Sequence, residues 1–447
     1  MQGKIPSNPA LSLFQTPLVN FIDESHSICQ LAQQIEWDAM SSELAEYYSD
    51  KGRPSVPIRK IVGLLILKRM FNESDESVMD RWIENPYWQY FTGEVYFQTQ
   101  GPFDPSDFVH FRKRVGKDGL EKILKYSIPV DEREKEIKRV AIDPTVQPKN
   151  ITYPTDTKLH VKIIKRCWKI AKQNGIRFRQ SFKRKIKEWL LELRFKNHPK
   201  KQKRARRAAR LIKNKSKVLL RDLERKLLGD QLSAYEELFT LFKKVINQKR
   251  TDINKIYSLH EVDVHCINKG KVFPKYEFGT KASIGWDMIS GYILGAVDGR
   301  NKYDGKLLEP TLDQIKRITG QEPLEAVVDR GCRGKKQIGN TKIIRPSRSQ
   351  TTKSRYEKEK ERKKMRKRAG IEPIISHLKY DHRMIRCFLS GKIGDQNNML
   401  LAAIGFNMRR RLKWLKSILL ALLPRLLWKA AHPWVSRSGD YSVSNFA

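Results

Sequence analysis

The chain is poor in cysteine, in acidic residues and in long apolar runs. Its five cysteines are scattered: Cys29, Cys167, Cys266, Cys332 and Cys387. They contain no C-x-x-C pair, which argues against a zinc ribbon and a disulfide framework and favours a reducing cytoplasm. The most apolar stretch, 418–428, is too short to span a bilayer and contains Pro424 and Arg425. The N-terminus lacks the pattern of a signal peptide. We therefore expect a cytoplasmic protein that does not enter a membrane.

The shortage of acidic residues leaves a large positive charge. There are 89 Lys and Arg against 49 Asp and Glu, a net charge of +40. Self-repulsion of this size disfavours a compact chain unless an anion compensates it. Nucleic acid phosphates are the natural compensators, because Lys and Arg release their counterions on binding. An anionic membrane surface and a merely soluble basic surface are the alternatives. We expect a protein associated with the nucleoid.

The first 135 residues predict helices. Residues 58–71 carry apolar side chains at helical spacing, Ser74 is a suitable N-cap for the next helix, and a basic helix begins near Ser106. Two short helices and a basic helix are typical of a helix-turn-helix module that reads DNA. The alternative is a plain helical bundle, in which aromatic residues 87–91 belong to the core. We expect residues 1–135 to form a helical DNA-binding domain.

Residues 158–255 form a second helical segment, which is nearly free of glycine. Between 181 and 220 there are roughly sixteen Lys or Arg but only two acids, Glu188 and Glu192. Apolar residues recur at helical spacing, which predicts a hairpin of helices with a basic exposed face. Because acids are missing, we expect phosphate contacts rather than a merely solvated face. The densest basic residues, and our candidates for DNA binding, are Lys201, Lys203, Arg204, Arg206 and Arg207.

Strand patterns flank this segment. Residues 138–146 predict a strand, and Pro144 supports it because the residue before proline is pushed out of helical geometry. Further strands are expected at 261–267, 276–284, 291–297, 324–328 and 342–344, and helices at 309–318, 371–378 and 398–415. This order is that of an α/β ribonuclease H-like catalytic core. Residues 136–157 supply its first strand, the basic helical insertion follows, residues 256–430 supply the remainder and the C-terminal helices, and 431–447 form a tail.

Three carboxylates lie at the edge of this expected core. Asp143 and Asp329 end apolar runs, and Glu372 opens a helix. In a ribonuclease H-like arrangement they can converge. Cleavage of a phosphodiester uses two hard cations about 3.5–4 Å apart, and oxygen ligands suit Mg²⁺ or Mn²⁺. Other carboxylates near strand ends, with turn or cap roles as the alternative, are Asp156, Asp263, Asp298 and Asp304.

The blocks around these carboxylates resemble those of the IS5-family transposases, within the IS4-like group of DDE transposases. They are Ala-Ile-Asp-Pro-Thr-Val-Gln-Pro-Lys-Asn at 141–150, Val-Asp-Arg-Gly-Cys-Arg-Gly at 328–334, and Ile-Glu-Pro-Ile-Ile-Ser-His-Leu-Lys at 371–379. Segments 52–91, 276–279, 303–305 and 400–415 also match, so the resemblance covers almost the whole chain. It implies that Asp143, Asp329 and Glu372 are catalytic and bind two Mg²⁺ or Mn²⁺ ions.

The family also has a signature of Tyr, Arg, Glu and Lys around the glutamate. Arg368, Glu372 and Lys379 match it, whereas Met365 stands at the tyrosine position. Both basic residues could face DNA near the active site, and Arg330 and Arg333 lie in the second block. Arg368 lies one turn before Glu372 only if one helix continues through Pro373, which proline disfavours. His377 is the histidine best placed for a role in the site.

The resemblance implies a transposase that binds the terminal inverted repeats of its element as a homodimer or higher multimer. It would cut double-stranded DNA with metal-activated water and join the freed 3′-hydroxyl to target DNA, without a covalent protein–DNA intermediate. Three alternatives are a catalytically inactive, transposase-derived DNA-binding protein, an RNA-binding protein, and a nuclease without strand transfer. The first is the main alternative, because Met365 departs from the signature.

Overall fold

The computed structural model describes residues 1–3, 15–268, 270, 275–300, 302–346 and 354–431, with side chains of the last helix as far as Ile418. Most of the predicted tail, 432–447, lies outside the described residues. The chain divides into two compact units. The first comprises Met1–Gln147, Lys281–Leu389 and Ile393–Ala447, and the second comprises Pro148–Thr280 and Ser390–Lys392. The N-terminal helices and most of the sheet therefore belong to one unit.

The N-terminal part of the first unit is helical, as predicted. Its helices are α1 (Ser27–Gln33), α2 (Trp37–Leu44), α3 (Ile58–Met70), α4 (Asp75–Glu84), α5 (Pro86–Phe91), α6 (Asp107–Ser127) and α7 (Val130–Glu134), with short 3-10 turns at Leu18–Asn20 and Ala45–Tyr47. The N-cap prediction is confirmed, because Ser74 and Ser77 form a reciprocal capping box at the start of α4. The aromatic cluster belongs to the core, since Trp88 and Phe91 are buried.

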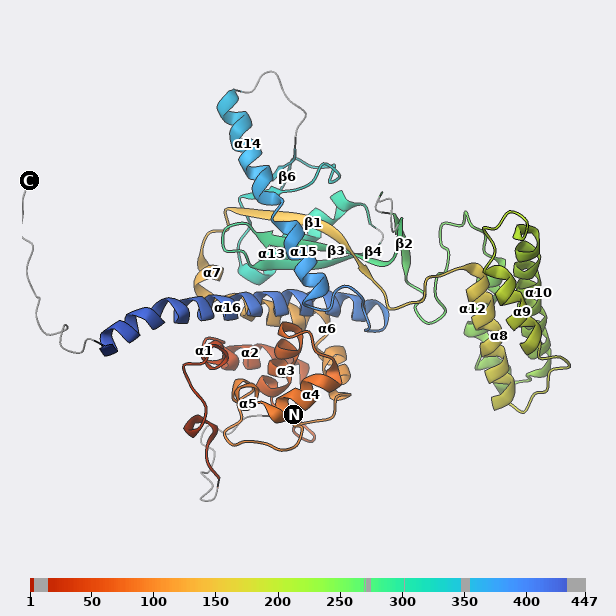
Figure 1. Ribbon diagram of the computed structural model, residues 1–447, viewed down its shortest axis with the longest axis horizontal. Helices are drawn as coiled ribbons and strands as arrows, with labels where there is room; N and C mark the ends of the chain where they lie inside the picture. The colour runs from red at the N-terminus through yellow and green to blue at the C-terminus, as the bar shows by residue number, and fades with distance from the viewer. Residues whose placement is uncertain (4–14, 269, 271–274, 301, 347–353, 432–447) are drawn as a thin grey trace, which may run out of the picture. The chain divides into compact units, whose positions relative to one another are not determined.

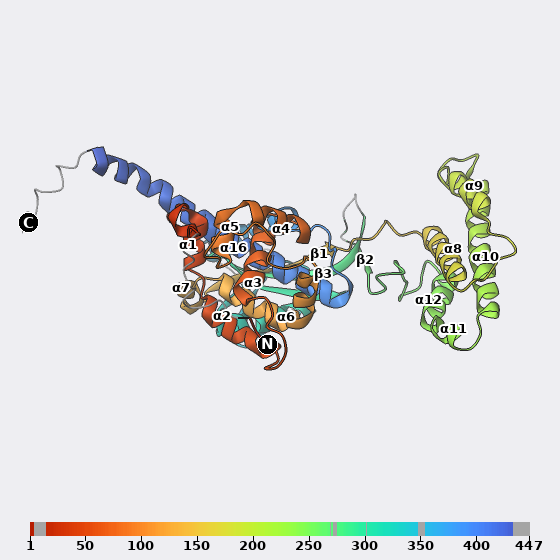
Figure 2. The ribbon, with the colours of Figure 1, turned by 90° about the horizontal axis from the view of Figure 1, so that it is seen from below.

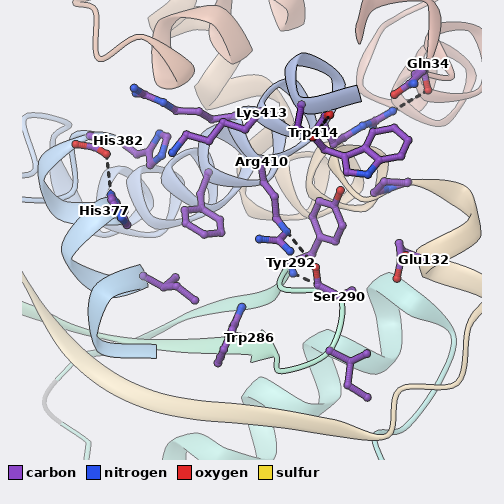
Figure 3. A pocket seen from close by; sticks show the side chains of 18 of the residues that line it. Gln34, Glu132, Trp286, Ser290, Tyr292, His377, His382, Arg410, Lys413 and Trp414 are labelled. Atoms are coloured by element: carbon purple, nitrogen blue, oxygen red, sulfur yellow. Dashed lines mark hydrogen bonds and ion pairs between the residues drawn. The ribbon is translucent and has the colours of Figure 1, made fainter. Parts of the chain in front are cut away.

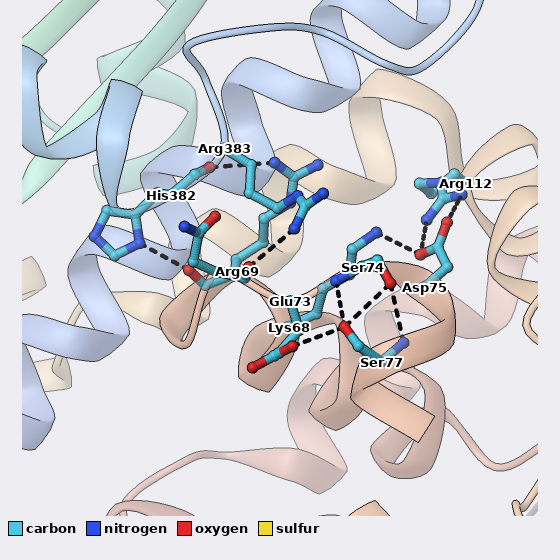
Figure 4. Close-up of polar contacts among 10 residues, drawn as sticks. Lys68, Arg69, Glu73, Ser74, Asp75, Ser77, Arg112, His382 and Arg383 are labelled. Carbon is cyan, nitrogen blue, oxygen red and sulfur yellow. Dashed lines mark hydrogen bonds and ion pairs between the residues drawn. The ribbon is translucent and has the colours of Figure 1, made fainter. Parts of the chain in front are cut away.

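A buried ionic cluster ties α3, α4 and α6 together (Figure 4). Asp75 accepts two hydrogen bonds of 2.9 Å from the Arg112 guanidinium and also contacts the Lys68 ammonium. Burial, reinforced by the neighbouring Arg69, lowers the pKa of Lys68 to about 7. Arg112 lies on the basic helix expected from Ser106 onward, but it is buried against Asp75. Its charge therefore stabilises the packing of the helices.

The sheet of the first unit has the spatial order β4-β3-β1-β5-β7-β6. Its strands are β1 (Arg139–Pro148), β3 (Tyr276–Asp287), β4 (Ile293–Arg300), β5 (Glu325–Val327), β6 (Gln337–Ile338) and β7 (Thr341–Ile344). β1, β5 and β7 are parallel neighbours, while β3 and β4 pair antiparallel. Together with α13 (Leu308–Thr319), these strands follow the predicted order of a ribonuclease H-like core.

The two faces of β1 have different partners, because successive side chains of a strand point to opposite sides. Val140 and Ile142 belong to the main core, which includes residues of α6, α13 and α16. Ala141 instead packs against Ile371 and Ile375. These belong to α15 (Ile371–Tyr380), so α15 covers the face of β1 toward which Asp143, two residues further on, also points.

The last helix, α16 (Gly391–Ala431), runs between the strands and helices α1–α5 (Figures 1 and 2). Its apolar residues from Met399 to Leu415 enter the main core. Gly405 lets it approach α3 closely, since a Cβ there would stand 2.6 Å from the Arg69 Cβ and 3.0 Å from its carbonyl carbon. No helix among the described residues has the length and apolar character needed to cross a membrane.

The second unit is mainly helical. It holds α8 (Asp156–Gln173), α9 (Lys183–Leu193), α10 (Gln202–Lys226), α11 (Asp230–Ser233) and α12 (Glu236–Asn247), which share their own apolar core. The predicted hairpin corresponds to α9 and α10, but α8 and α12 also pack on α10, so the segment is a bundle rather than a hairpin. β2 (His265–Asn268) pairs with the first residues of β3, which belong to the same unit.

Two predictions about elements need correction, and one element was not predicted. The strand expected at 261–267 begins only at His265, because the Glu261 carboxylate accepts the Gly391 amide and pairs with buried Lys149 instead of following a strand. The strand expected at 291–297 is shifted to Ile293–Arg300. The basic run at 355–367 is a regular helix, α14 (Arg355–Arg368), started by a capping box of Ser354 and Glu357.

Candidate active site

Two of the predicted carboxylates lie at the same edge of the sheet. Ala141 of β1 and Val327 of β5 are paired in parallel register, and Asp143 and Asp329 each follow two residues later. Parallel strands lie about 4.8 Å apart and side chains repeat every second residue. The fold therefore brings Asp143 and Asp329 to adjacent positions at the carboxyl ends of their strands.

Arg368, the last residue of α14, lies between these carboxylates. Its Nη2 donates to Asp143 Oδ1 at 2.7 Å, and its Nη1 lies 4.0 Å from Asp329 Oδ1. The Arg368 side chain is only 14% exposed, and its Nε has no hydrogen-bond partner in the part of the chain that the structure describes. One guanidinium is thus shared by two carboxylates, which leaves the cluster with an excess of negative charge.

The surroundings of Asp143 disfavour the charged form of its carboxyl group. Burial raises the pKa of Asp143 to about 6; Arg368 opposes this rise, whereas Asp329 and Glu372 add to it. Its side chain is 20% exposed, compared with 56% for Asp329. Asp143 and Asp329 are thus joined through Arg368, while Glu372 contributes only a weaker electrostatic effect on Asp143.

Glu372 belongs to a different helix from Arg368. Helix α14 ends at Arg368 and α15 begins at Ile371, so the break expected from Pro373 is present at Ala369–Gly370. Gly370 packs against Trp286, because a Cβ there would lie 3.1 Å from the indole ring. On α15, at about 100° per residue, Glu372 and Lys379 share one flank and Pro373 and His377 share the other.

The chemistry of the donor set suits a hard cation. Carboxylate oxygens are the ligands that Mg²⁺ and Mn²⁺ prefer, and the excess negative charge around Asp143 is what such an ion would relieve. Within the described ranges, no three Asp, Glu, His or Cys side chains stand close enough together to hold a metal ion. Arg368 instead provides the positive charge between Asp143 and Asp329.

The loop after β5 is held by residues that were not predicted as part of the site. Tyr303 donates its hydroxyl hydrogen to the Gly331 carbonyl and accepts the Arg333 amide at 3.2 Å. Arg345 donates to the Cys332 carbonyl at 2.6 Å. These bonds fix the backbone that carries Asp329. The block at 303–305 contained the signal for Tyr303, whereas nothing near Arg345 in the sequence pointed to its role.

The alternative carboxylates have cationic partners of their own. Each forms an ion pair: Asp156 with Lys255 at 2.9 Å, Asp263 with Lys392 at 3.3 Å, Asp298 with Arg300 at 3.4 Å and Asp304 with Lys281 at 2.8 Å. His377 is exposed and contacts Asp381 at 2.8 Å. Within the described residues, Arg368 forms ion pairs with Asp143 and Asp329 but with none of these side chains.

The predicted DNA-binding residues fall into two groups. Around the carboxylates, Arg330 and Arg333 are exposed in the loop after β5, and Lys379 is half-buried on α15. In the second unit, Arg204 pairs with Glu192 of α9 at 2.9 Å, and the Lys201 ammonium lies 4.2 Å from the Phe195 ring centre. The exposed residues of α10 without an acidic partner in the described part of the chain include Lys203, Arg206 and Arg207.

Comparison with known proteins agrees with the ribonuclease H-like core that the sheet and its acidic edge define. Residues 17–114 match the family described as Transposase domain (DUF772), and residues 258–408 match Transposase DDE domain. An uncharacterized protein, ORF8 in the nfe locus of Rhizobium meliloti, is 38% identical over 192 residues, which are 42% of this chain and 93% of the relative. No solved structure matches the chain.

The chain belongs to the DDE transposases, which are metal-dependent enzymes that cut and join DNA. The match to the DDE domain includes Asp329 and Glu372 but begins after Asp143 and after α12, the last helix of the second unit. Asp143 precedes the matched segment, but in the structure it lies beside Asp329, because both carboxylates contact Arg368.

Proposed function

We propose that this chain is the transposase of an IS5-type insertion sequence, which binds the terminal inverted repeats of its element as a multimer. It cuts the DNA at the element ends and joins the 3′-hydroxyls to target DNA. The observation that carries the proposal is the pair of carboxylates, Asp143 and Asp329, at one sheet edge around one guanidinium, with the helix of Glu372 packed on the same face.

In this proposal Asp143, Asp329 and Glu372 hold two Mg²⁺ or Mn²⁺ ions, which supply activation of the attacking oxygen and stabilisation of the leaving oxygen. Asp143 must release its proton to serve as a ligand, so competition with the proton weakens metal loading as pH falls below about 6. Arg368 moves its charge from the carboxylates to a DNA phosphate. Arg330, Arg333 and Lys379 position the backbone of the same DNA segment.

The parts of the chain take separate tasks in this proposal. Residues 1–135 contribute a helical domain that recognises DNA, and residues 136–157 and 256–430 form the catalytic core. The basic insertion, 158–255, contacts phosphates along α10 through Lys201, Lys203, Arg204, Arg206 and Arg207. These side chains are exposed, and Lys203, Arg206 and Arg207 lack acidic partners in the described part of the chain. Such contacts bind DNA of any sequence and weaken as salt rises.

A cleavage and strand-transfer assay tests the proposal. The protein is incubated with Mg²⁺ or Mn²⁺ and a DNA fragment that carries the flanking ends of its own gene. We expect metal-dependent nicking at those ends, lost in Asp143→Asn, Asp329→Asn and Glu372→Gln, with DNA binding retained. Asp263→Asn is the matched control, because this carboxylate is exposed and paired with Lys392.

Each outcome separates one alternative. If a variant cuts at the wild-type rate, the substituted residue is not part of the active site. Specific binding of the ends without cutting by any protein favours the inactive, transposase-derived DNA-binding protein, and nicking without joined products favours a nuclease.

A further inference from the structure

A groove of about 1110 Å³ lies beside α15 within the first unit. Pro373, Ile374 and His377 of α15 line one side, and residues 406–417 of α16 line the other. Because Pro373 and His377 are on the flank of α15 opposite Glu372, helix α15 separates the groove from the carboxylates. The groove therefore lies on the flank of α15 that faces away from Glu372.

The α16 wall of the groove is strongly basic. The Arg409 Nη1 donates to the Met70 carbonyl and the Arg410 Nε donates to the Ser290 carbonyl, both at 3.0 Å. Carbonyl oxygens orient these guanidinium groups but do not neutralise them. Lys413 is exposed and has no acidic partner within the described residues. The wall thus presents a group of positive charges over little more than one turn of helix.

The acidic residues of the groove are already paired. Asp131 and Glu132 contact Lys135 at 3.7 and 2.8 Å. Asp381 contacts His377 at 2.8 Å, while Arg409 also contributes to lowering the pKa of Asp381. Most of the positive charge on α16 therefore remains available to a polyanion.

Aromatic side chains alternate with these cations. Trp414 is 56% exposed on α16, next to Lys413. Figure 3 shows Arg410 reaching from α16 over Tyr292, with its guanidinium carbon 5.4 Å from the ring centre. Trp286 also lines the groove, and its buried Nε1 has no hydrogen-bond partner among the described residues. A basic groove with an exposed aromatic face is the combination that binds unpaired nucleotides.

We propose that this groove binds a single strand of DNA, with phosphates along α16 and a base stacked on Trp414. The inference rests on the proposed function, in which cutting one strand of a duplex frees an end that can unpair. A duplex would keep its base faces stacked inside and could not use Trp414. An acidic protein segment would satisfy Arg409 and Lys413 but would leave the aromatic faces without stacking partners.

The test measures binding of a short fluorescein-labelled oligothymidylate to the full chain in EDTA, by anisotropy and by quenching of tryptophan fluorescence. We expect Trp414→Leu to weaken binding roughly tenfold or more, as the loss of one base stack does, and to remove part of the quenching. Tyr380→Leu is the matched control, since Tyr380 is exposed on α15 but does not line the groove. Lys413→Gln should reduce the salt slope by about 0.7, the value for one phosphate contact on a single strand.

Equal affinity and quenching in Trp414→Leu and the wild type would overturn the inference, as would equal losses for the oligothymidylate and a duplex of the same length. Trp414→Leu and Lys413→Gln both change exposed side chains of α16. A folding defect of either variant, seen by circular dichroism, would therefore contradict the described packing of α16. The assay contains no divalent metal, so its result is independent of whether Asp329→Asn abolishes cleavage. Failure of the groove and failure of the active site are thereby distinguished.

Discussion

Replacing Asp143 by asparagine should make the metal-free protein more stable. The pKa of Asp143 lies near 6, above its ordinary value of 3.8, chiefly because burial disfavours the charged carboxylate. A neutral asparagine of nearly the same shape does not carry that cost. The substitution that destroys the proposed metal site should therefore stabilise the fold that holds it.

The magnitude follows from the pKa difference. About two pKa units at 1.36 kcal/mol each give about 3 kcal/mol, and this is an upper value because solvent reaches part of the side chain. The folded state binds the proton more tightly than the unfolded state, so wild-type stability falls as pH rises from about 4 to about 6 and then stays low. The advantage of Asp143→Asn is thus absent near pH 4, grows through this window and is complete above it, at roughly 1–3 kcal/mol.

Thermal unfolding of both proteins at pH 4 and pH 8 in EDTA is the assay. We expect equal melting temperatures at pH 4 and a melting temperature a few degrees higher for Asp143→Asn at pH 8. Millimolar Mg²⁺ should raise the melting temperature of the wild type but not that of the variant, since only an intact site gains free energy from the ion. An unchanged or lower melting temperature for the variant at pH 8 without metal would refute the reasoning, because Arg368 would then compensate the buried charge fully.

Three further substitutions test the packing of the N-terminal helices and the loop after β5. Asp75→Ala leaves Lys68 and Arg112 buried without a counter-charge and should lower the free energy of unfolding by about 3 kcal/mol in urea titration; a loss below about 1 kcal/mol would contradict the cluster. Ser74→Ala removes the N-cap of α4 and should cost about 1 kcal/mol in the same titration, and no measurable loss would argue against the capping box. Tyr303→Phe removes a hydrogen bond to the loop after β5, worth about 1 kcal/mol, so cleavage should slow roughly fivefold while DNA affinity is unchanged; an equal loss of affinity would show a direct role in binding.

The elements that could be predicted are those with a local signal. Helix α3 follows from its apolar spacing and β1 from an apolar run closed by Pro144. Strand β6 has only two residues, too few to show alternation. Helix α14 has almost no apolar face, so only its capping box distinguishes it from a solvated basic run. The contact of Arg368 with Asp143 joins residues 225 positions apart, and no periodicity of the chain predicts such a pairing.

One helix determines the geometry of both proposed sites. The buried stripe of α15, Ile371, Ile374, Ile375 and Leu378, fixes how the helix is rotated about its axis. With that rotation fixed, Glu372 lies on the flank toward the carboxylates and His377 lies on the flank that lines the groove. A change of one residue in register would turn the helix by about 100° and move both side chains away from their sites. The apolar residues of α15 therefore determine where Glu372 and His377 lie, and the two proposed sites depend on them as well as on the charged residues.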